Sequence, residues 1–377
     1  MHEAHKRSLE ALARRRRLRS LQPRRGLDFA SNDYLGLGHS GELATAAREA
    51  LDRGVPVGAG ASRLLRGNHP EHEALEAEAA AFFGSEAALF FGGGFQANSA
   101  LFATLPQRGD LILHDELIHA SAHDGMALSH ADNCAFAHND PNAASDAIDV
   151  WRAAGGKGRI WIAVETLYSM DGDAAPLGAL DTLANRHDAM LALDEAHATG
   201  VCGPNGRGLG AMLEGRENVI ALHTCGKALG ASGALLTLPA ILRDYMVNRA
   251  RPFIYATAPS PLNAAIARAA LKLVHDEPER RRQLADLVAH TGELLRERCS
   301  ISPTGTHIQP VIVHRDERAL QIAHALQDAG FDIRAIRPPT VPDGTARLRL
   351  SLTLNVTADD VSHLIEQLSP MLAEVAS

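Results

Sequence analysis

Short apolar runs alternate with longer amphipathic segments along much of the chain. Their length predicts buried strands. The runs cover residues 87–91, 111–113, 160–164, 190–193, 219–222 and 234–238. Several intervening segments have helical length or a helical stripe, as at Leu177, Leu180 and Leu183. This alternation predicts an α/β domain with a parallel or mostly parallel sheet and helices on both faces. Ligands bind such sheets at the carboxyl ends of the strands.

The two ends of the chain have a different pattern. Residues 1–25 are rich in arginine and carry a partial leucine stripe, which predicts a solvated amphipathic helix. A long helical region follows Pro261, and then come a strand (307–313), a helix (320–329), a strand (346–354) and a helix (358–372). We therefore expect three parts: an N-terminal arm (1–45), a large domain (46–272) and a smaller C-terminal α+β domain (273–377).

Composition narrows the class of protein. Of the 377 residues 46% are hydrophobic, enough for a sizeable core, and a net charge of −8 gives no support for a nucleic-acid or anionic-membrane partner. The four cysteines have no CxxC spacing, and no HExxH motif occurs, so we expect neither a disulfide framework nor a metal site. No signal peptide and no membrane-spanning run is evident. These features predict a cytoplasmic protein.

Lys227 is the most informative residue. It lies in Thr224-Cys225-Gly226-Lys227-Ala228-Leu229-Gly230, directly after the apolar run 219–222. A lysine that is partly desolvated at a strand end favours the neutral amine, which forms a Schiff base with aldehydes such as pyridoxal phosphate (PLP). The alternative from this segment alone is an ordinary lysine that extends out of a loop.

A glycine-rich turn at residues 92–94 offers two interpretations. It connects a predicted strand to a predicted helix, and the backbone N–H groups of a helix start bind phosphate. The segment also fits G-x-G-x-x-A through Gly92, Gly94 and Ala97, with Asp115 roughly 20 residues on, as a nicotinamide dinucleotide site requires. A phosphate site, a dehydrogenase site and a purely structural turn all remain open.

Asp194 and His197 follow the run 190–193 in the tetrapeptide Asp194-Glu195-Ala196-His197. A carboxylate at this strand end can hold a proton on the pyridine nitrogen of PLP, and the imidazole can bond the phenolic oxygen. The structural alternatives are a helix N-cap and a core histidine. A joint role with Lys227 favours the cofactor interpretation.

Two further side chains are candidates for substrate contact. His119 follows the run 111–113, where an imidazole can stack on a flat ring, although a surface histidine is equally compatible with the pattern. Arg347 and Arg349 alternate on a late predicted strand, so one of them can face a cleft as a carboxylate clamp. Their alternative is a pair of solvated edge charges.

Five motifs make the sequence similar to the α-oxoamine synthases, PLP enzymes of the aspartate-aminotransferase-like fold, over nearly the whole chain. The motifs are Ser31-Asn32-Asp33-Tyr34-Leu35-Gly36, Gly67-Asn68-His69-Pro70, Tyr168-Ser169-Met170-Asp171-Gly172-Asp173, Asp194-Glu195-Ala196-His197 and Thr224-Cys225-Gly226-Lys227. The resemblance implies fold type I: a large domain with a mostly parallel seven-stranded sheet, a smaller C-terminal α+β domain and an N-terminal helical arm. Glu195 departs from the family, where aspartate is frequent.

The resemblance also implies a role for each site residue. Lys227 carries PLP, Asp194 pairs with the pyridine nitrogen, His197 and Ser169 contact the ring oxygen, and His119 stacks on the ring. Gly94, Phe95 and Thr224 contact the phosphate, and Thr257 reaches the phosphate of a neighbouring subunit. Asn32 and Arg349 meet the amino-acid carboxylate, whereas Arg19 and Thr340 touch the acyl substrate.

Residues 335–350, which include Ala335-Ile336-Arg337-Pro338-Pro339-Thr340-Val341-Pro342, resemble the branch of the family that serves biotin synthesis. That branch condenses L-alanine with a pimeloyl thioester of coenzyme A or acyl carrier protein, and it implies a homodimer. A sibling activity on glycine and a short acyl thioester remains the alternative within the family.

Overall fold

The computed structural model describes residues 2–373. The chain divides into two compact units. The larger unit contains Leu35–Ser169 and Asp173–Arg281, and the smaller unit contains the chain up to Tyr34, the short segment Met170–Gly172 and the chain from Arg282 onward. Within the described residues, no helix has the length and apolar character to cross a membrane.

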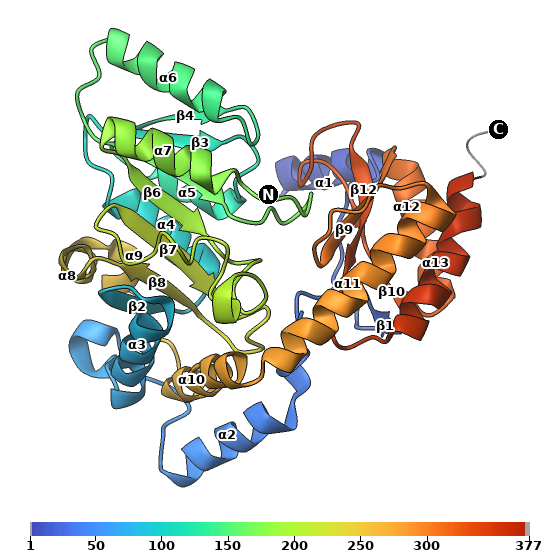
Figure 1. The fold of residues 1–377 in the computed structure, drawn as a ribbon, viewed down its shortest axis with the longest axis horizontal. Coiled ribbons are helices and arrows are strands. Elements are labelled where there is room, and N and C mark those ends of the chain that lie inside the picture. Colours follow the sequence, from blue (N-terminus) through green and yellow to red (C-terminus); the bar gives the residue numbers. More distant parts are fainter. Residues whose placement is uncertain (1, 374–377) are drawn as a thin grey trace. The chain divides into compact units, whose positions relative to one another are not determined.

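A seven-stranded sheet forms the centre of the larger unit (Figure 1). Its strand order is β2-β8-β7-β6-β5-β3-β4, and β8 alone runs antiparallel to its neighbours. The strands are β2 (Ala87–Phe91), β3 (Leu111–Asp115), β4 (Asp132–Phe136), β5 (Ile160–Glu165), β6 (Met190–Asp194), β7 (Val219–Thr224) and β8 (Ala234–Leu238). The mostly parallel seven-stranded sheet confirms the expected fold class.

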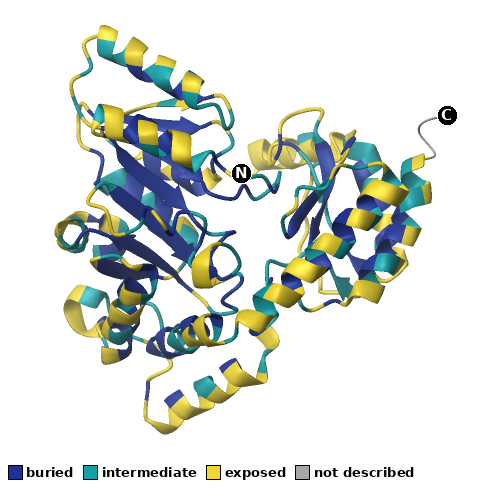
Figure 2. Ribbon diagram, in the orientation of Figure 1, coloured by how far each residue is buried: buried dark blue, intermediate teal, exposed yellow. Residues whose placement is uncertain are grey.

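Helices cover both faces of this sheet because alternate strand residues point to opposite sides. One apolar cluster joins β-strand residues such as Ile112 and Ile220 to helices α4, α5, α8 and α9. A second joins Leu113 and Leu191 to α6 and α7, which Figure 1 shows on one side of the sheet. Figure 2 shows the sheet buried and the outer helix faces exposed. The helices are α2 (Gly41–Asp52), α3 (Pro70–Phe83), α4 (Gly94–Thr104), α5 (Ala120–Ala127), α6 (Pro141–Ala153), α7 (Leu177–His187), α8 (Ala240–Arg249), α9 (Arg251–Ile254) and α10 (Pro261–Asp276).

The smaller unit is an α+β arrangement. A three-stranded antiparallel sheet has the order β11-β12-β9, and a short parallel pair joins β1 to β10. The strands are β1 (Leu27–Asp28), β9 (Ile308–His314), β10 (Phe331–Asp332), β11 (Ala335–Ile336) and β12 (Ala346–Ser351). The helices are α1 (Glu3–Arg14), α11 (Pro278–Cys299), α12 (Asp316–Asp328) and α13 (Ala358–Ala373).

The unit boundaries differ from the expected ones at 45/46 and 272/273, which fall inside helices α2 and α10. Backbone pairing of β1 with β10 ties the N-terminal segment to the C-terminal part, so that segment is not a separate arm domain. Helix α10 packs against α2 and α3 in the larger unit. The expected helix over residues 1–25 is also too long, because α1 ends at Arg14 and Arg16 has a positive φ of 55°.

Candidate active site

Lys227 and His197 meet at the carboxyl ends of two adjacent parallel strands. Strand β7 ends at Thr224 and β6 ends at Asp194, and the two strands pair directly. Lys227 Nζ lies 2.6 Å from His197 Nε2, and His197 is 5% exposed. The structure therefore brings together two of the predicted catalytic residues where ligands bind α/β sheets.

A tight loop fixes Lys227. Cys225 N–H donates to the carbonyl of Gly233 (2.9 Å), and Ala231 N–H donates to the carbonyl of Cys225 (2.9 Å). Gly230 has a positive φ of 60°, and a Cβ there would overlap the backbone of Leu37 and Gly38. Only glycine combines a positive φ with the absence of a Cβ atom. Gly230 therefore sets the path of the loop that carries Lys227.

Asp194 is the start of a buried hydrogen-bond chain that leads to His119. Asn98 Nδ2 donates to Asp194 Oδ2 (2.7 Å) and to Ser121 Oγ (3.0 Å). Ser121 Oγ in turn lies 2.8 Å from His119 Nδ1. Asn98 and Ser121 are 4% and 1% exposed. Helix α4 supplies Asn98, so this helix links the carboxylate at the end of β6 to the histidine at the start of α5.

The direction of these bonds defines the tautomer of His119. Ser121 N–H donates to His119 Nδ1 (3.2 Å), which makes that nitrogen an acceptor. The hydroxyl of Ser121 accepts from Asn98 and donates to the same nitrogen. A neutral His119 therefore carries its proton on Nε2. Although His119 keeps an exposed surface, burial by surrounding atoms and the charge of Lys227 lower the pKa of its imidazole, which favours this neutral form.

Glu165 is a buried carboxyl group beside this cluster. It ends β5 opposite Asp194 in the strand register, it is 2% exposed, and its Oε2 accepts from Ser169 N–H (3.0 Å). Its Oε1 is buried and has no hydrogen-bond partner among the described residues. Burial, followed by the charge of Asp194, raises the pKa of Glu165 to about 8. Glu165 is therefore largely protonated at neutral pH. Its Oε2 holds the backbone of Ser169, the residue that is predicted to contact the cofactor ring.

Glu195, the departure from the family motif, has a structural role. Its side chain accepts from Thr166 Oγ1 (2.7 Å), Leu209 N–H (3.0 Å) and Gly210 N–H (2.5 Å). The residue is 0% exposed, and burial raises its pKa to about 7. It tethers the loop after β6 and leaves the adjacent Asp194 to face Asn98.

The start of helix α4 lies next to Thr224. A Cβ on Gly94 would lie 3.7 Å from Thr224 Oγ1, in ordinary contact, so the two residues are neighbours. The first N–H groups of the helix have no intrahelical partner and attract phosphate. Phe95 is the next residue of the helix and is 53% exposed. A primary amine, a buried carboxylate and a helix N-terminus are the donor set that an aldehyde-, pyridine- and phosphate-bearing cofactor needs, so these residues fit PLP.

Arg349 and Asn32 meet inside the smaller unit. Arg349 Nη1 donates to Asn32 Oδ1 (3.0 Å) and Ser351 Oγ (2.8 Å), and Nη2 donates to Tyr34 Oη (3.2 Å). Arg349 is 7% exposed, and its Nε is buried without a hydrogen-bond partner among residues 2–373. This guanidinium therefore retains a free donor for a carboxylate. The alternative of a solvated edge charge is wrong.

Arg347 has a structural partner instead. It is 2% exposed, and Nη1 donates to Asp171 Oδ1 (2.5 Å) and to the carbonyl of Met170 (3.1 Å). Arg19 and Thr340 are joined in the same unit, since Arg19 Nη2 donates to Thr340 Oγ1 (3.1 Å). Thr257 lies after α9 and is exposed.

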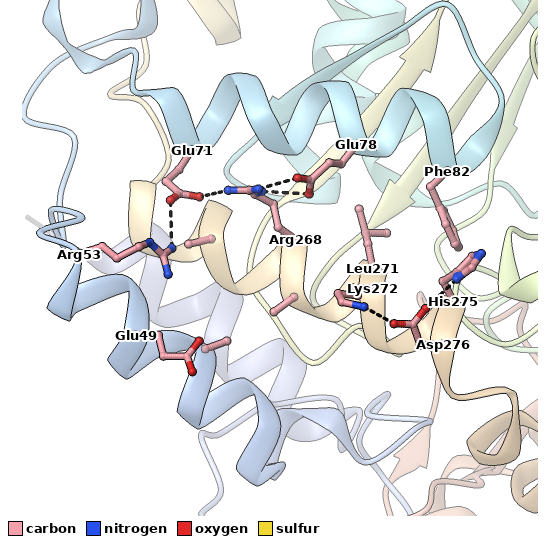
Figure 3. Close-up of a pocket in the computed structure, with 13 residues that line it drawn as sticks. Glu49, Arg53, Glu71, Glu78, Phe82, Arg268, Leu271, Lys272, His275 and Asp276 are labelled. Atoms are coloured by element: carbon pink, nitrogen blue, oxygen red, sulfur yellow. Dashed lines mark hydrogen bonds and ion pairs between the residues drawn. The ribbon is translucent and has the colours of Figure 1, made fainter.

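A cavity of about 620 Å³ between α2, α3 and α10 contains none of the predicted residues. Figure 3 shows ion pairs among most of its charged side chains, with Glu49 apart from them. Arg268 binds Glu71 (2.5 Å) and Glu78 (2.5 Å), and Arg53 binds Glu71 (3.2 Å). Most of the charge in this cavity is therefore taken up by ion pairs between its own walls.

The carboxylate of Asp115 has a structural role. It is 0% exposed and accepts from Leu117 N–H (2.8 Å), Asn139 N–H (2.8 Å) and the ring of His138 (2.9 Å). It therefore has no free surface for a ribose, as the dinucleotide interpretation of the Gly92 turn requires. No group of metal-ligating side chains occurs among the residues that the structure describes.

Comparison with known proteins decides between the cofactors. The family described as Aminotransferase class I and II matches residues 24–368. The chain belongs to this aminotransferase family. The dehydrogenase alternative is therefore wrong.

Individual relatives show which enzymes of the aminotransferase family this chain is similar to. A protein of Anaeromyxobacter dehalogenans, named 8-amino-7-oxononanoate synthase, is 40% identical over 98% of this chain and 94% of its own length. A crystal structure of 8-amino-7-oxononanoate synthase from Francisella tularensis is 28% identical over 93% of this chain and 99% of its own, with a TM-score of 0.77. A high-resolution structure of SPT with PLP as an internal aldimine is 26% identical over 92% of this chain and 87% of its own, with a TM-score of 0.84.

Sequence reasoning missed three residues of the cluster: Asn98, Ser121 and Glu165. Glu165 had a detectable signal, because it ends an apolar run as Asp194 does. Asn98 is a polar residue among buried apolar positions of α4, which indicates a buried amide that needs partners. Ser121 follows His119 by two residues, and nothing in the spacing identifies it as the link to Asn98.

Proposed function

We propose that this protein catalyses the decarboxylative condensation of L-alanine with a pimeloyl thioester to give 8-amino-7-oxononanoate, the reaction of its relatives in biotin synthesis. Full-length relatives at 40% identity support the assignment. The observation that carries it is the Lys227–His197 contact beside the Asp194–Asn98–Ser121–His119 chain. Asp194 ends β6 and Lys227 follows the adjacent strand β7, so the carboxylate and the amine lie at the same edge of the sheet.

PLP, when bound, supplies an electron sink for negative charge at the Cα atom of the amino acid. In the proposed arrangement Lys227 Nζ holds its aldehyde carbon, and the N-terminus of α4 with Thr224 holds its phosphate. Asp194 holds a proton on the ring nitrogen, while Asn98 keeps the carboxylate in position. His197 and Ser169 bond the ring oxygen, and His119 lies against the ring.

Lys227 performs the proton transfers. Once the amino group of alanine has displaced it, the neutral Nζ takes the Cα proton, and the ammonium group later returns a proton to the same carbon after the thioester has reacted and CO2 has left. His197, 2.6 Å from Nζ, orients the amine between these steps. His119 donates from Nε2 to a carboxylate or carbonyl oxygen of the substrate.

Residues of the smaller unit bind the substrates in this proposal. Arg349, whose Nε has no partner among the described residues, binds the carboxylate of alanine together with Asn32. Arg19 and Thr340 contact the acyl chain. A guanidinium held by Tyr34, Asn32 and Ser351 is well suited to bind a planar carboxylate with a fixed orientation.

We also propose a homodimer, in which Thr257 contacts the phosphate bound by the neighbouring subunit, and a cytoplasmic location. The exposure of Thr257 agrees with a role toward another chain. The four cysteines at positions 134, 202, 225 and 299 are free, which agrees with a reducing compartment. Light scattering of the purified protein tests the dimer.

A substrate matrix tests the proposed activity. L-Alanine, glycine and L-serine are each combined with pimeloyl-, acetyl- and palmitoyl-coenzyme A, and free thiol is measured with the wild type and with Lys227→Ala. We expect thiol release for alanine with pimeloyl-coenzyme A and none for the variant. Faster turnover of glycine with acetyl-coenzyme A would assign the sibling activity instead.

A further inference from the structure

His138 lies between two carboxylates at the edge of the central sheet where the parallel strands end. It follows β4 by two residues, and 22% of its side chain is exposed. Its Nδ1 lies 2.9 Å and 3.1 Å from the two carboxylate oxygens of Asp115, and its Nε2 lies 2.8 Å from Asp173 Oδ2. Asp115 ends β3, the neighbour of β4, and all three residues belong to the larger unit. Each ring nitrogen therefore faces a carboxylate.

This arrangement requires a protonated ring. A neutral imidazole has one N–H group and can donate to one of the two carboxylates, whereas an imidazolium donates to both. Asn139, whose Nδ2 lies 3.3 Å from Nε2, donates instead to Asp173 Oδ2 (2.7 Å) and to the carbonyl of Ala174 (3.3 Å). The imidazolium of His138 thus joins Asp115 to Asp173.

The titratable groups around the ring favour this form. Although burial lowers the pKa of His138, the hydrogen bonds and charges of the two carboxylates raise it overall. The other titratable groups that face His138 are Tyr168, whose ring packs edge-on at 4.5 Å, and Glu116, whose Oε1 accepts from the backbone N–H of His138 (3.0 Å). Asp140, at the start of α6, accepts from amides of its own helix. These neighbours are acidic, so they favour the imidazolium.

Asp173 closes a hairpin that carries Ser169. Within residues 166–175, Tyr168 N–H donates to the carbonyl of Asp173 (2.9 Å), and Ser169 follows Tyr168 directly. Both members of this backbone pair reach His138, Asp173 through its carboxylate and Tyr168 through its ring. A displacement of Asp173 therefore moves the residue that precedes Ser169.

We propose that His138 is a positioning residue for the cofactor site: its imidazolium holds Asp173, and through the hairpin it fixes the hydroxyl of Ser169 that bonds the ring oxygen of PLP. This inference rests on the proposed function, which gives Ser169 that bond. A histidine that only stabilises the fold would act independently of Ser169. The two roles therefore differ in whether the effect of His138 depends on the serine hydroxyl.

A double-mutant cycle measures that dependence. The dissociation constant of PLP is measured by spectroscopic titration of the cofactor-free wild type, His138→Gln, Ser169→Ala and the double variant, and urea unfolding checks that each is folded. His130→Gln is the matched control, since His130 is an exposed histidine of the same unit. We expect His138→Gln to weaken PLP binding about 3- to 30-fold in the wild-type background and less than about twofold in the Ser169→Ala background. His130→Gln should match the wild type.

The pH dependence of PLP binding is a second readout, which a purely structural role would not change. Because the pKa of His138 is raised, the ring holds both carboxylates at low pH and releases one of them as the pH rises through that value. The ratio of the dissociation constants of His138→Gln and the wild type should therefore be largest near about pH 6 and fall toward about pH 9. Asp173→Asn leaves one carboxylate at the ring, so it should weaken PLP binding without this pH dependence. This variant keeps the imidazole in place and carries the test if His138→Gln does not fold.

Three results would overturn the inference. They are an unchanged PLP dissociation constant in folded His138→Gln, equal losses with and without the hydroxyl of Ser169, and a ratio that stays constant from about pH 6 to about pH 9. A protein that shows the expected coupling but releases no thiol from alanine and pimeloyl-coenzyme A would contradict the proposed function and leave the positioning role intact.

Discussion

Replacement of Asn98 by alanine tests whether the buried amide holds the cofactor site together. The side chain is 4% exposed and donates to Asp194 Oδ2 at 2.7 Å and to Ser121 Oγ at 3.0 Å. A hydrogen bond to a charged acceptor contributes about 1.5–3 kcal/mol. If that bond aligns Asp194 for the ring nitrogen, its loss should weaken PLP binding roughly 10- to 100-fold.

The assay is a spectroscopic titration of the cofactor-free protein with PLP, in parallel with urea unfolding of the same preparation. Ser99→Ala is the matched control, because Ser99 lies on the same helix and does not contact Asp194. Among the residues that the structure describes, its hydroxyl donates only to the carbonyl of Ser121, at 3.5 Å. A dissociation constant for folded Asn98→Ala within twofold of that for Ser99→Ala would refute the reasoning.

Three further substitutions probe other parts of the site. Lys227→Ala removes the amine that moves the Cα proton; we expect a loss in kcat of about 10²–10⁴-fold or more, and borohydride should no longer fix PLP to the protein. Arg349→Gln removes the carboxylate donor, so KM for alanine should rise about tenfold or more while PLP binding is unchanged. Burial raises the pKa of Glu165 from 4.5 to about 8, so the cofactor-free folded protein keeps a proton that the unfolded chain releases. Its free energy of unfolding should therefore fall by a few kcal/mol from about pH 4.5 to pH 8, and Glu165→Gln should flatten that slope.

Each of these expectations has a contradicting result. Borohydride fixation in Lys227→Ala would place the reactive amine elsewhere. An unchanged KM for alanine in Arg349→Gln would remove that residue from substrate binding. An unfolding free energy with the same pH dependence in the wild type and Glu165→Gln would mean that the pKa of Glu165 is not raised in the fold.

The central strands were predictable because both of their faces are buried. The run at 87–91 coincides with β2, and the run at 234–238 coincides with β8. An unbroken apolar run is typical of a strand that is covered on both faces. Strand β4 was missed for the opposite reason. It lies at the sheet edge, its sequence is Asp132-Asn133-Cys134-Ala135-Phe136, and all but the last residue keep an exposed surface.

The site was predictable where one residue carries the chemistry by itself. Lys227, Asp194 and His197 follow strand ends, and the fold brings strand ends together. Asn98 was not recognised, because its role depends on a partner 96 residues away. The end of the N-terminal helix could not be predicted from the sequence either. Helix α1 ends at Arg14, just before Arg16 adopts a positive φ, and the arginine-rich sequence does not indicate that change of backbone conformation.

The most direct test of the central claim follows the carboxyl carbon of alanine. The PLP-loaded protein is supplied with L-alanine labelled with ¹³C in the carboxyl group and with a pimeloyl thioester, and the label is observed by NMR. We predict one labelled CO2 for each unlabelled 8-amino-7-oxononanoate formed. Labelled pyruvate, the product of transamination, or label retained in the condensed product would contradict the account.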